Sequence, residues 1–297
     1  MTYSIVARDE KSGELGVAVQ SHYFSVGSIV SWARSGVGAV ATQSTAEITY
    51  GPLGLELMGS GKSAPEALGA LLKADPKAEH RQVAMIDSQG RVATHTGSMC
   101  LPFAGHAAGD QCSCQGNIMR SEKVWVSMRD SFEGNRGMPL AERLVAALEA
   151  GEAAGGDARG KQSAALLVVS KDAAPNYWAG RLVDLRVEDH PEPVPELKRL
   201  LRYQRGYDWV SKGDEYLASK RYSDALAAYE RGLAIVPEVD ELKYWVGLGL
   251  LMTDQKERGR EMLKGLFARD GNWVQITRGL LSARSVPVDP DSLKGLL

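Results

Sequence analysis

The chain is poor in cysteine, carries almost no net charge and has no long apolar run. Three cysteines among 297 residues do not form a disulfide framework, because the number is odd and small for this length. Lys and Arg number 35 against 37 Asp and Glu, with no basic stripe, so no binding to nucleic acid is expected. No apolar run approaches the roughly 20 residues that cross a bilayer, so no membrane contact is expected either.

The sequence also lacks several motifs that are recognisable by their spacing. It contains no P-loop, no GxGxxG after a predicted strand and no GxSxG elbow. Its first residues, MTYSIVARD, show no basic region followed by an apolar one, so no secretory signal is expected. A cytoplasmic location is the resulting expectation.

The first 190 residues alternate between strand and helix patterns. Two β-rich runs, 3–7 and 15–19, flank a turn at 9–13 and predict an antiparallel hairpin. Runs 28–33 and 37–42 predict a second hairpin. Ser63 and Glu66 have the spacing of a capping box, which predicts a helix start. The remaining predictions are strands at 82–87, 91–96, 112–115, 163–169 and 180–187, and helices at 51–61, 63–75, 121–132 and 139–150.

This order of elements predicts an α+β fold. Helices that cover the outer faces of two stacked sheets bury such a pattern economically. The run SAALLVV at 163–169 is apolar throughout, as expected of a strand that is covered on both faces. We therefore predict a four-layer αββα sandwich over residues 1–190.

The composition changes after residue 190. Pro191, Pro193 and Pro195 predict a linker over 191–203, and helical patterns follow. The spacing of a tetratricopeptide (TPR) repeat of about 34 residues is met by Trp209, Gly213, Tyr216, Ala225, Tyr229 and Pro237. A second repeat is degenerate. Because fewer than three such repeats rarely stand alone, the TPR-like module at 204–297 is expected to pack on the first domain or on a second copy of the chain, and a homo-oligomer is expected.

Four segments carry a closer resemblance to a known family: GELGVAVQS, WARSGVGAVATQ, GGDARGKQSAALLVV and VDLRVEDHP. Together they resemble the bacterial domain-of-unknown-function 1028 (DUF1028) family, over about residues 1–200. That family is grouped with the N-terminal-nucleophile (Ntn) hydrolases of the proteasome-subunit type and has no settled substrate. The resemblance implies the same αββα fold and a reactive residue at the start of the first strand.

Thr2 is the nucleophile that the resemblance implies. Threonine is small enough for methionine aminopeptidase to remove Met1, which would leave Thr2 as the first residue. Its hydroxyl is then the nucleophile, and its own α-amine, with an unperturbed pKa of about 7.7–8, is the general base. The alternative is a threonine that merely favours β structure at a strand start.

Two positions depart from the proteasome pattern. In those enzymes an acidic residue that ends the second strand and a lysine that ends the third support the nucleophile. The matching positions here hold Ser21 and, approximately, Arg34. Ser21 supplies no charge, and Arg34 does not carry protons at ordinary pH. Arg34 is therefore expected to orient the nucleophile or to hold a substrate carboxylate by a bidentate contact.

The loop after the fourth helix supplies two more expected catalytic residues, Asp157 and Ser163. In the proteasome type, an aspartate and a serine of this loop approach the N-terminal threonine. The alternative for this segment is a flexible loop with a solvated ion pair.

Residues expected near the substrate are Ser21, His22, Gln43, Ser44 and Asn117. Backbone N–H groups at Gln43 and Ser44 are candidates for an oxyanion hole, with an ordinary polar loop as the alternative. Asn117 either lies beside the nucleophile or caps the next helix. His22 either lines the pocket or is an ordinary histidine.

A rival constellation consists of His95, Cys100, His106, Cys112 and Cys114. Zinc takes four such ligands in tetrahedral geometry. The segment has no paired C-x-x-C, so buried thiols and ordinary histidines are favoured and no metal is expected.

The sequence thus favours hydrolysis of a small or non-peptide amide through Thr2, a chemistry that needs no cofactor. The alternative is a non-catalytic scaffold whose TPR-like module binds a protein partner.

Overall fold

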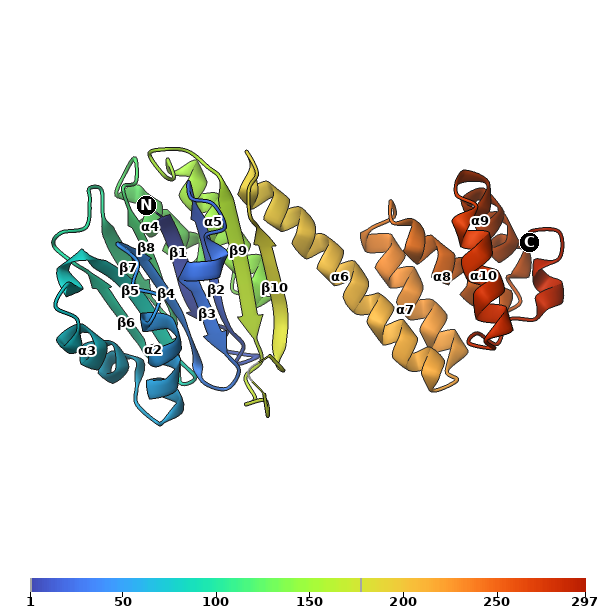
Figure 1. The fold of residues 1–297 in the computed structure, drawn as a ribbon, viewed down its shortest axis with the longest axis horizontal. Coiled ribbons are helices and arrows are strands. Elements are labelled where there is room, and N and C mark those ends of the chain that lie inside the picture. Colours follow the sequence, from blue (N-terminus) through green and yellow to red (C-terminus); the bar gives the residue numbers. More distant parts are fainter. Residues whose placement is uncertain (1, 177) are drawn as a thin grey trace. The chain divides into compact units, whose positions relative to one another are not determined.

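The structure is a computed structural model that describes residues 2–176 and 178–297. The chain divides into two compact units, the first ending at Leu201 and the second beginning at Arg202. The first unit is a mixed α/β fold with two antiparallel sheets, and the second is helical (Figure 1). Among the described residues, none of the helices combines the length and apolar character that a membrane span requires.

The larger sheet has six strands in the order β10-β9-β2-β1-β8-β7. β1 pairs with β2 on one side and with β8 on the other, so the strand that begins at Thr2 lies inside the sheet. The bounds of the strands are β1 (Thr2–Arg8), β2 (Leu15–Ser21), β7 (Gly105–Gly109), β8 (Cys112–Asn117), β9 (Ser163–Val169) and β10 (Arg181–Val187).

The smaller sheet has four strands in the order β3-β4-β5-β6. Their bounds are β3 (Ser31–Arg34), β4 (Gly38–Ser44), β5 (Arg81–Asp87) and β6 (Val92–Thr96). The two sheets face each other across one apolar core, to which the larger sheet contributes Val6 and Val17 and the smaller sheet Ala41 and Ile86.

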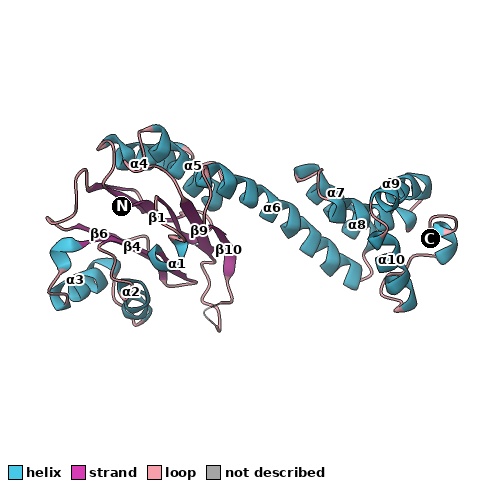
Figure 2. Ribbon diagram, turned by 45° about the horizontal axis from the view of Figure 1, so that its top comes forward, coloured by secondary structure: helices cyan, strands magenta, loops and turns pink. Residues whose placement is uncertain are grey.

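Helices cover the outer face of each sheet (Figure 2). Tyr3 and Ala18, on the outer face of the larger sheet, belong to the core formed with α4 (Lys123–Gly134) and α5 (Leu140–Ala153). The smaller sheet packs on α2 (Tyr50–Gly59) and α3 (Ala64–Ala74). The remaining helices of this unit are short, α1 (Gly27–Val30) and the 3₁₀ helix η1 (Ala78–His80). Strand β9 is buried throughout, as its apolar run predicts.

The capping box at the start of α3 is confirmed. The Ser63 hydroxyl accepts from the Glu66 N–H at 3.3 Å, and the Glu66 carboxylate accepts from the Ser63 N–H at 2.8 Å. Each side chain thus satisfies an N–H group that the first helical turn leaves without a partner.

Three sequence predictions differ from the structure. Residues 28–33 are not one strand, because α1 turns Val26 and Val30 into the core between the sheets before β3 begins at Ser31. Strand β7, which is short and bounded by glycines, was not predicted. The linker expected over 191–203 is largely helical, since α6 (Pro193–Ala218) starts at Pro193. A proline in the first helical turn costs no hydrogen bond, because the N–H groups there have no acceptor within the helix.

The second unit continues from α6 with four further helices and a 3₁₀ turn. They are α7 (Tyr222–Ile235), α8 (Asp240–Leu251), α9 (Lys256–Arg269), α10 (Asn272–Ser282) and η2 (Pro290–Leu293). Gly213 in α6 lies against Tyr229 in α7, because a Cβ at Gly213 would stand only 2.3 Å from the tyrosine ring. The Tyr229 hydroxyl donates to Asp214 Oδ1 at 2.7 Å. The absence of a side chain at 213 therefore permits α6 and α7 to approach closely.

Candidate functional site

Thr2 stands at the first position of β1, opposite Asn117 of β8. Its side chain faces the interior between the two sheets, as Ser4 and Val6 do two and four residues later. The residue is 4% exposed. The Thr2 hydroxyl donates to the Ser21 hydroxyl at the end of β2, at 3.0 Å. The ends of β2 and β8 therefore fix the position of the threonine.

The main-chain carbonyl of Thr2 is held from the opposite sheet. Gln43 Nε2, at the end of β4, donates to this oxygen at 3.0 Å, and Asn117 Nδ2 approaches it at 3.5 Å. The same two amides donate to Gln82 Oε1, at 2.8 and 2.9 Å. Gln82 Nε2 in turn lies 2.9 Å from the Gly116 carbonyl. Buried amides that satisfy one another in this way rigidify the end of the sandwich.

Gln82 was not among the predicted site residues. Its signal in the sequence is a polar side chain at a core-facing position of β5, since Ala84 and Ile86 follow it on the same face. A fully buried glutamine needs partners for both its amide and its carbonyl. In the fold those partners come from the strand ends around Thr2.

A pocket of about 340 Å³ opens at Thr2. Its wall is largely apolar, and beside the hydroxyl-bearing Thr2 and Tyr23 its polar members are Gln43 and Ser44. Ser44 has a φ of 74°, a left-handed conformation that costs a residue other than glycine on the order of 1 kcal/mol. The other lining residues are Tyr23, Val26, Ile29, Val30, Ala46 and Ile48. The pocket suits an uncharged apolar group.

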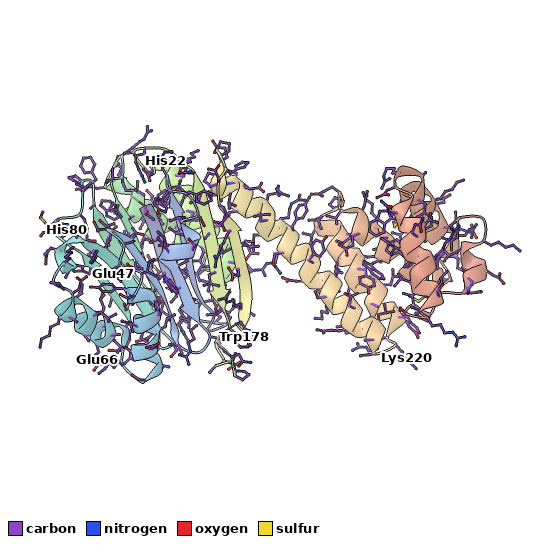
Figure 3. All side chains as sticks on the ribbon, viewed as in Figure 1. His22, Glu47, Glu66, His80, Trp178 and Lys220 are labelled. Atoms are coloured by element: carbon purple, nitrogen blue, oxygen red, sulfur yellow. The ribbon has the colours of Figure 1, made fainter. Side chains whose placement is uncertain are left out.

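Asp157 is fully buried and fixes the loop beside the site. Its Oδ2 accepts from the His22 N–H at 3.1 Å and lies 2.9 Å from Arg159 Nη2. A β-bridge between Asp157 and Met119 ties the loop to the chain that leaves β8. Among the described residues, the hydrogen bond of the Thr2 hydroxyl is to Ser21 and not to Asp157. The aspartate therefore holds the end of β2 through the backbone of His22. Figure 3 labels His22 at the top of the first unit.

Ser163 holds one wall of the pocket. Its hydroxyl donates to the Tyr23 carbonyl at 2.5 Å and accepts from the Val26 N–H at 3.0 Å. Ser163 also lies opposite Ser21 in the pairing of β2 with β9. It thus sets the loop that brings Tyr23 and Val26 to the pocket.

The structure does not bring Arg34 to Thr2. Arg34 pairs with Gly38 at the start of β4, whereas Gln43 and Ser44 stand at the other end of that strand. Ser44 lies six residue steps along the extended strand from Gly38, a distance on the order of 20 Å. The expected role of Arg34 at the nucleophile is therefore corrected: the chain order indicates which strand carries the arginine, but the register decides at which end it lies.

The histidines and cysteines of the rival constellation are dispersed. In the part of the chain that the structure describes, no group of three His, Cys, Asp or Glu side chains is placed to hold a metal ion. His95 Nε2 lies 2.9 Å from the Ala78 carbonyl, and His106 Nδ1 lies 2.9 Å from the Thr96 hydroxyl. Cys112 and Cys114 are buried in the core beneath α4 and α5.

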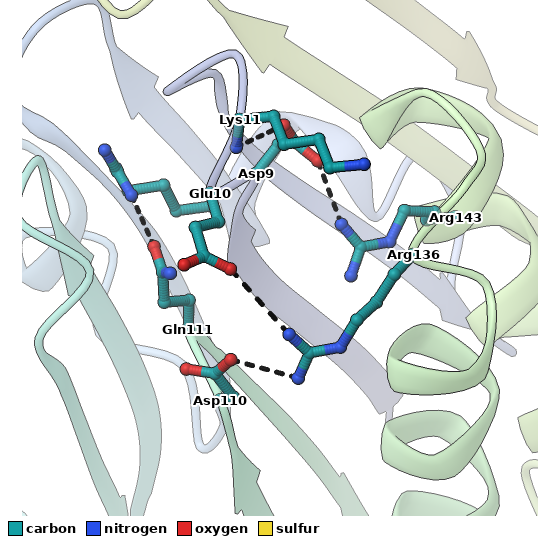
Figure 4. Close-up of a pocket in the computed structure, with 8 residues that line it drawn as sticks. Asp9, Glu10, Lys11, Asp110, Gln111, Arg136 and Arg143 are labelled. Atoms are coloured by element: carbon teal, nitrogen blue, oxygen red, sulfur yellow. Dashed lines mark hydrogen bonds and ion pairs between the residues drawn. The ribbon is translucent and has the colours of Figure 1, made fainter.

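A small cavity at the far end of β1 holds a cluster of ion pairs (Figure 4). Arg143 Nη1 donates to Asp9 Oδ2 at 3.0 Å, and the Arg143 guanidinium lies over the Phe132 ring at 3.8 Å from its centroid. Arg136 lies 3.0 Å from Asp110. The cavity measures about 40 Å³, room for a few water molecules at most. These charges pair with one another, so the cluster is structural.

Comparison with known proteins points to one family. A family model described as "Family of unknown function (DUF1028)" matches residues 2–197. The crystal structure of protein SPO2555 from Silicibacter pomeroyi, also described as DUF1028, is similar with a TM-score of 0.61 and 28% sequence identity, over 68% of this chain and 88% of that chain. No curated protein matches the chain.

Proposed function

Because the chain belongs to the DUF1028 family, whose function is unknown, we propose that it is an N-terminal-nucleophile amide hydrolase with Thr2 as the nucleophile. The two sheets with helices on their outer faces support assignment to the αββα sandwich of that class. Removal of Met1 is part of the proposal, and Met1 lies outside the described residues.

The observation that carries the proposal is the setting of the Thr2 hydroxyl. It lies at an apolar pocket of about 340 Å³ and is hydrogen-bonded to Ser21 at 3.0 Å. The carbonyl of the same residue is fixed by Gln43. Thr2 is thus fixed by hydrogen bonds to residues whose own positions are fixed by the sheets. Catalysis by orientation requires a nucleophile whose position is fixed in this way.

The proposed reaction has two steps. In the first, Thr2 Oγ attacks the carbonyl carbon of the amide while its proton passes to the α-amine of Thr2. The C–N bond then breaks, and the leaving amine takes that proton, so that an ester on Thr2 remains. In the second step a water molecule attacks the ester with the same amine as base, which releases the carboxylic acid and restores the hydroxyl. The chemistry needs no cofactor.

The lining of the pocket supports a substrate with an apolar acyl group. An apolar wall accepts a hydrocarbon chain or ring and offers no compensation for a buried charge. We assign the binding of the acyl group to the wall that Ser163 holds, and the stabilisation of the oxyanion to backbone groups near Ser44. Asp157 is a positioning residue that orders His22 and the end of β2.

The test is hydrolysis of a panel of N-acyl amides that differ in acyl length. Intact-mass measurement first establishes whether Met1 has been removed. Thr2→Val removes the hydroxyl at nearly constant volume and is expected to abolish turnover, whereas Thr2→Ser is expected to retain part of it. Thr94→Val on β6 serves as the matched control. Equal turnover by Thr2→Val and the wild-type protein would exclude the mechanism.

A second candidate function is a non-catalytic scaffold whose TPR-like module binds a protein partner or a second copy of the chain. The substitution of a neutral Ser21 for the expected acid favours this candidate, as does the distance of Arg34 from Thr2. It predicts that no amide of the panel is hydrolysed, even by a chain that lacks Met1. Light scattering of the full chain tests the homo-oligomer.

A further inference from the structure

A second pocket lies at the edge of the sandwich, where the outermost strands β3 and β10 of the two sheets both contribute to its lining. Its volume is about 420 Å³, within the range of small-molecule sites. The pocket belongs to the first unit and includes none of the residues that line the pocket at Thr2.

Three arginines converge on this pocket: Arg34 from β3, and Arg181 and Arg186 from β10. Arg181 Nη1 lies 2.5 Å from Asp184 Oδ2, and Arg186 Nε lies 3.5 Å from Asp184 Oδ1. One carboxylate therefore serves two guanidinium groups.

Arg34 makes no ion pair within the described residues, and Glu56 is the one acidic member of the lining. The carboxylates of Asp184 and Glu56 thus balance two of the three arginines, which leaves an excess of one positive charge. A guanidinium presents paired N–H donors whose spacing matches a carboxylate.

Apart from Ser28 and Ser31, the rest of the lining is apolar and preformed. The Trp32 indole donates its Nε1–H to the Ile29 carbonyl at 3.0 Å, which fixes the orientation of the ring. Gly51 makes room for the ring, because a Cβ at that position would stand 2.4 Å from it. Leu55 and Leu167 complete the apolar part of the wall. An arginine site beside a fixed aromatic wall suits a ligand with a charged end and a hydrocarbon body.

One residue of the lining, Ser31, also has an unsatisfied polar atom. The hydroxyl of Ser31 is buried and has no hydrogen-bond partner among the described residues. An unsatisfied buried hydroxyl costs free energy that a ligand atom or a water molecule recovers.

The geometry points to a binding site for a small monocarboxylate with an apolar or aromatic body. A single excess positive charge matches one carboxylate better than a doubly charged phosphate. The helix α1 separates this site from the pocket at Thr2: Ile29 and Val30 line the Thr2 pocket, and Gly27 and Ser28 line the arginine pocket. The site stands on its own observations, whether or not Thr2 is catalytic.

The test uses the full chain and 3-phenylpropionate as the probe, with isothermal titration calorimetry at low ionic strength. The wild-type protein is expected to bind the carboxylate about tenfold or more tightly than the neutral 3-phenylpropanamide. Arg34→Gln and Arg186→Gln are each expected to weaken binding of the carboxylate by about tenfold or more. Arg129→Gln, at an arginine on α4 that pairs with its neighbour Asp130, is the matched control and is expected to bind as the wild-type protein does.

Three results would overturn the proposal. They are no heat of binding with the wild-type protein, equal affinity for the carboxylate and the amide, and unchanged affinity in Arg34→Gln and Arg186→Gln. The last result would place the probe elsewhere on the chain. Circular dichroism of each variant verifies folding, and Arg34 is suited to substitution because it has no ion pair to lose within the described residues.

Discussion

Gln43 donates its side-chain amide to the main-chain carbonyl of Thr2 at 3.0 Å, although the two residues belong to different sheets. This bond joins the sheets at the end where the pocket opens. Gln43 Oε1 also accepts from the Ser4 hydroxyl at 2.7 Å. The position of the proposed nucleophile therefore depends on a side chain 41 residues away in the sequence.

Replacement of Gln43 tests this dependence. Gln43→Ala leaves the carbonyl of Thr2 and the amide carbonyl of Gln82 with fewer donors in a buried region. The expected loss in the free energy of unfolding is about 1–3 kcal/mol, measured by urea denaturation. Gln89→Ala, at an exposed glutamine in the β5–β6 turn, is expected to leave stability unchanged. A loss in both variants, or in neither, would contradict the role given to Gln43.

A carboxylate beside the start of β5 predicts a pH dependence. Asp75 accepts from Arg81 Nε at 2.8 Å, from the Lys77 N–H at 2.8 Å and from the Tyr50 hydroxyl at 3.1 Å. Chiefly through the bond from Arg81, the pKa of Asp75 is lowered to about 2. The unfolded value is about 3.9, so the carboxylate stabilises the fold above that pH.

This contribution is lost as the pH falls from about 4 to about 2. Asp75→Asn is therefore expected to be less stable than the wild-type protein at pH 7 and to lose less stability over that interval. Urea denaturation at a series of pH values measures both quantities. Asp172→Asn, at an exposed aspartate, is the control and should follow the wild-type curve. An Asp75→Asn curve parallel to that of the wild-type protein would refute the assignment.

The helical unit offers a matched pair of glycines. Gly213→Ala places a methyl group against the Tyr229 ring, and the overpacking is expected to cost about 1–3 kcal/mol. Gly265 in α9 has no atom within 4 Å of an added Cβ, so Gly265→Ala is expected to stabilise its helix by about 0.5–1 kcal/mol. Thermal denaturation of the full chain compares the two. Equal effects of the same sign would show that Gly213 is not a packing requirement.

Size selection by the pocket at Thr2 is a further prediction. Ala46 lines that pocket, and Ala46→Phe fills part of its volume. The variant is expected to raise KM for amides with long acyl groups and to leave KM for acetyl amides near the wild-type value, because a short acyl group does not reach the wall. An equal rise for both substrates would place the acyl group elsewhere.

The sequence indicated much of the fold because its patterns are local. The turn after β1 and the capping box at Ser63 each depend on residues a few positions apart, and both appear in the structure. Runs of strand-forming residues likewise located β5, β9 and β10. The short β7 escaped notice because its glycines and alanines carry little of that signal.

The candidate site was harder to predict, because it depends on register. Ser21 and Asn117 meet Thr2 through the pairing of β1 with β2 and β8, and Gln43 reaches it from the opposite sheet. Their positions at strand ends made them visible in the sequence. Arg34 lies at the opposite end of β4, a fact that only the pairing with Gly38 reveals. The buried Gln82 was overlooked because a single polar residue in a strand does not indicate which residues will form hydrogen bonds with it.

The most direct test of the central claim is chemical trapping of the nucleophile. The wild-type protein is treated with a β-lactone that carries an apolar side chain, and the acylated residue is located by tandem mass spectrometry. The account predicts one added lactone, as an ester on Thr2 of a chain that lacks Met1, and no addition to Thr2→Val. A wild-type chain that retains Met1, or that is acylated equally in Thr2→Val, would contradict it.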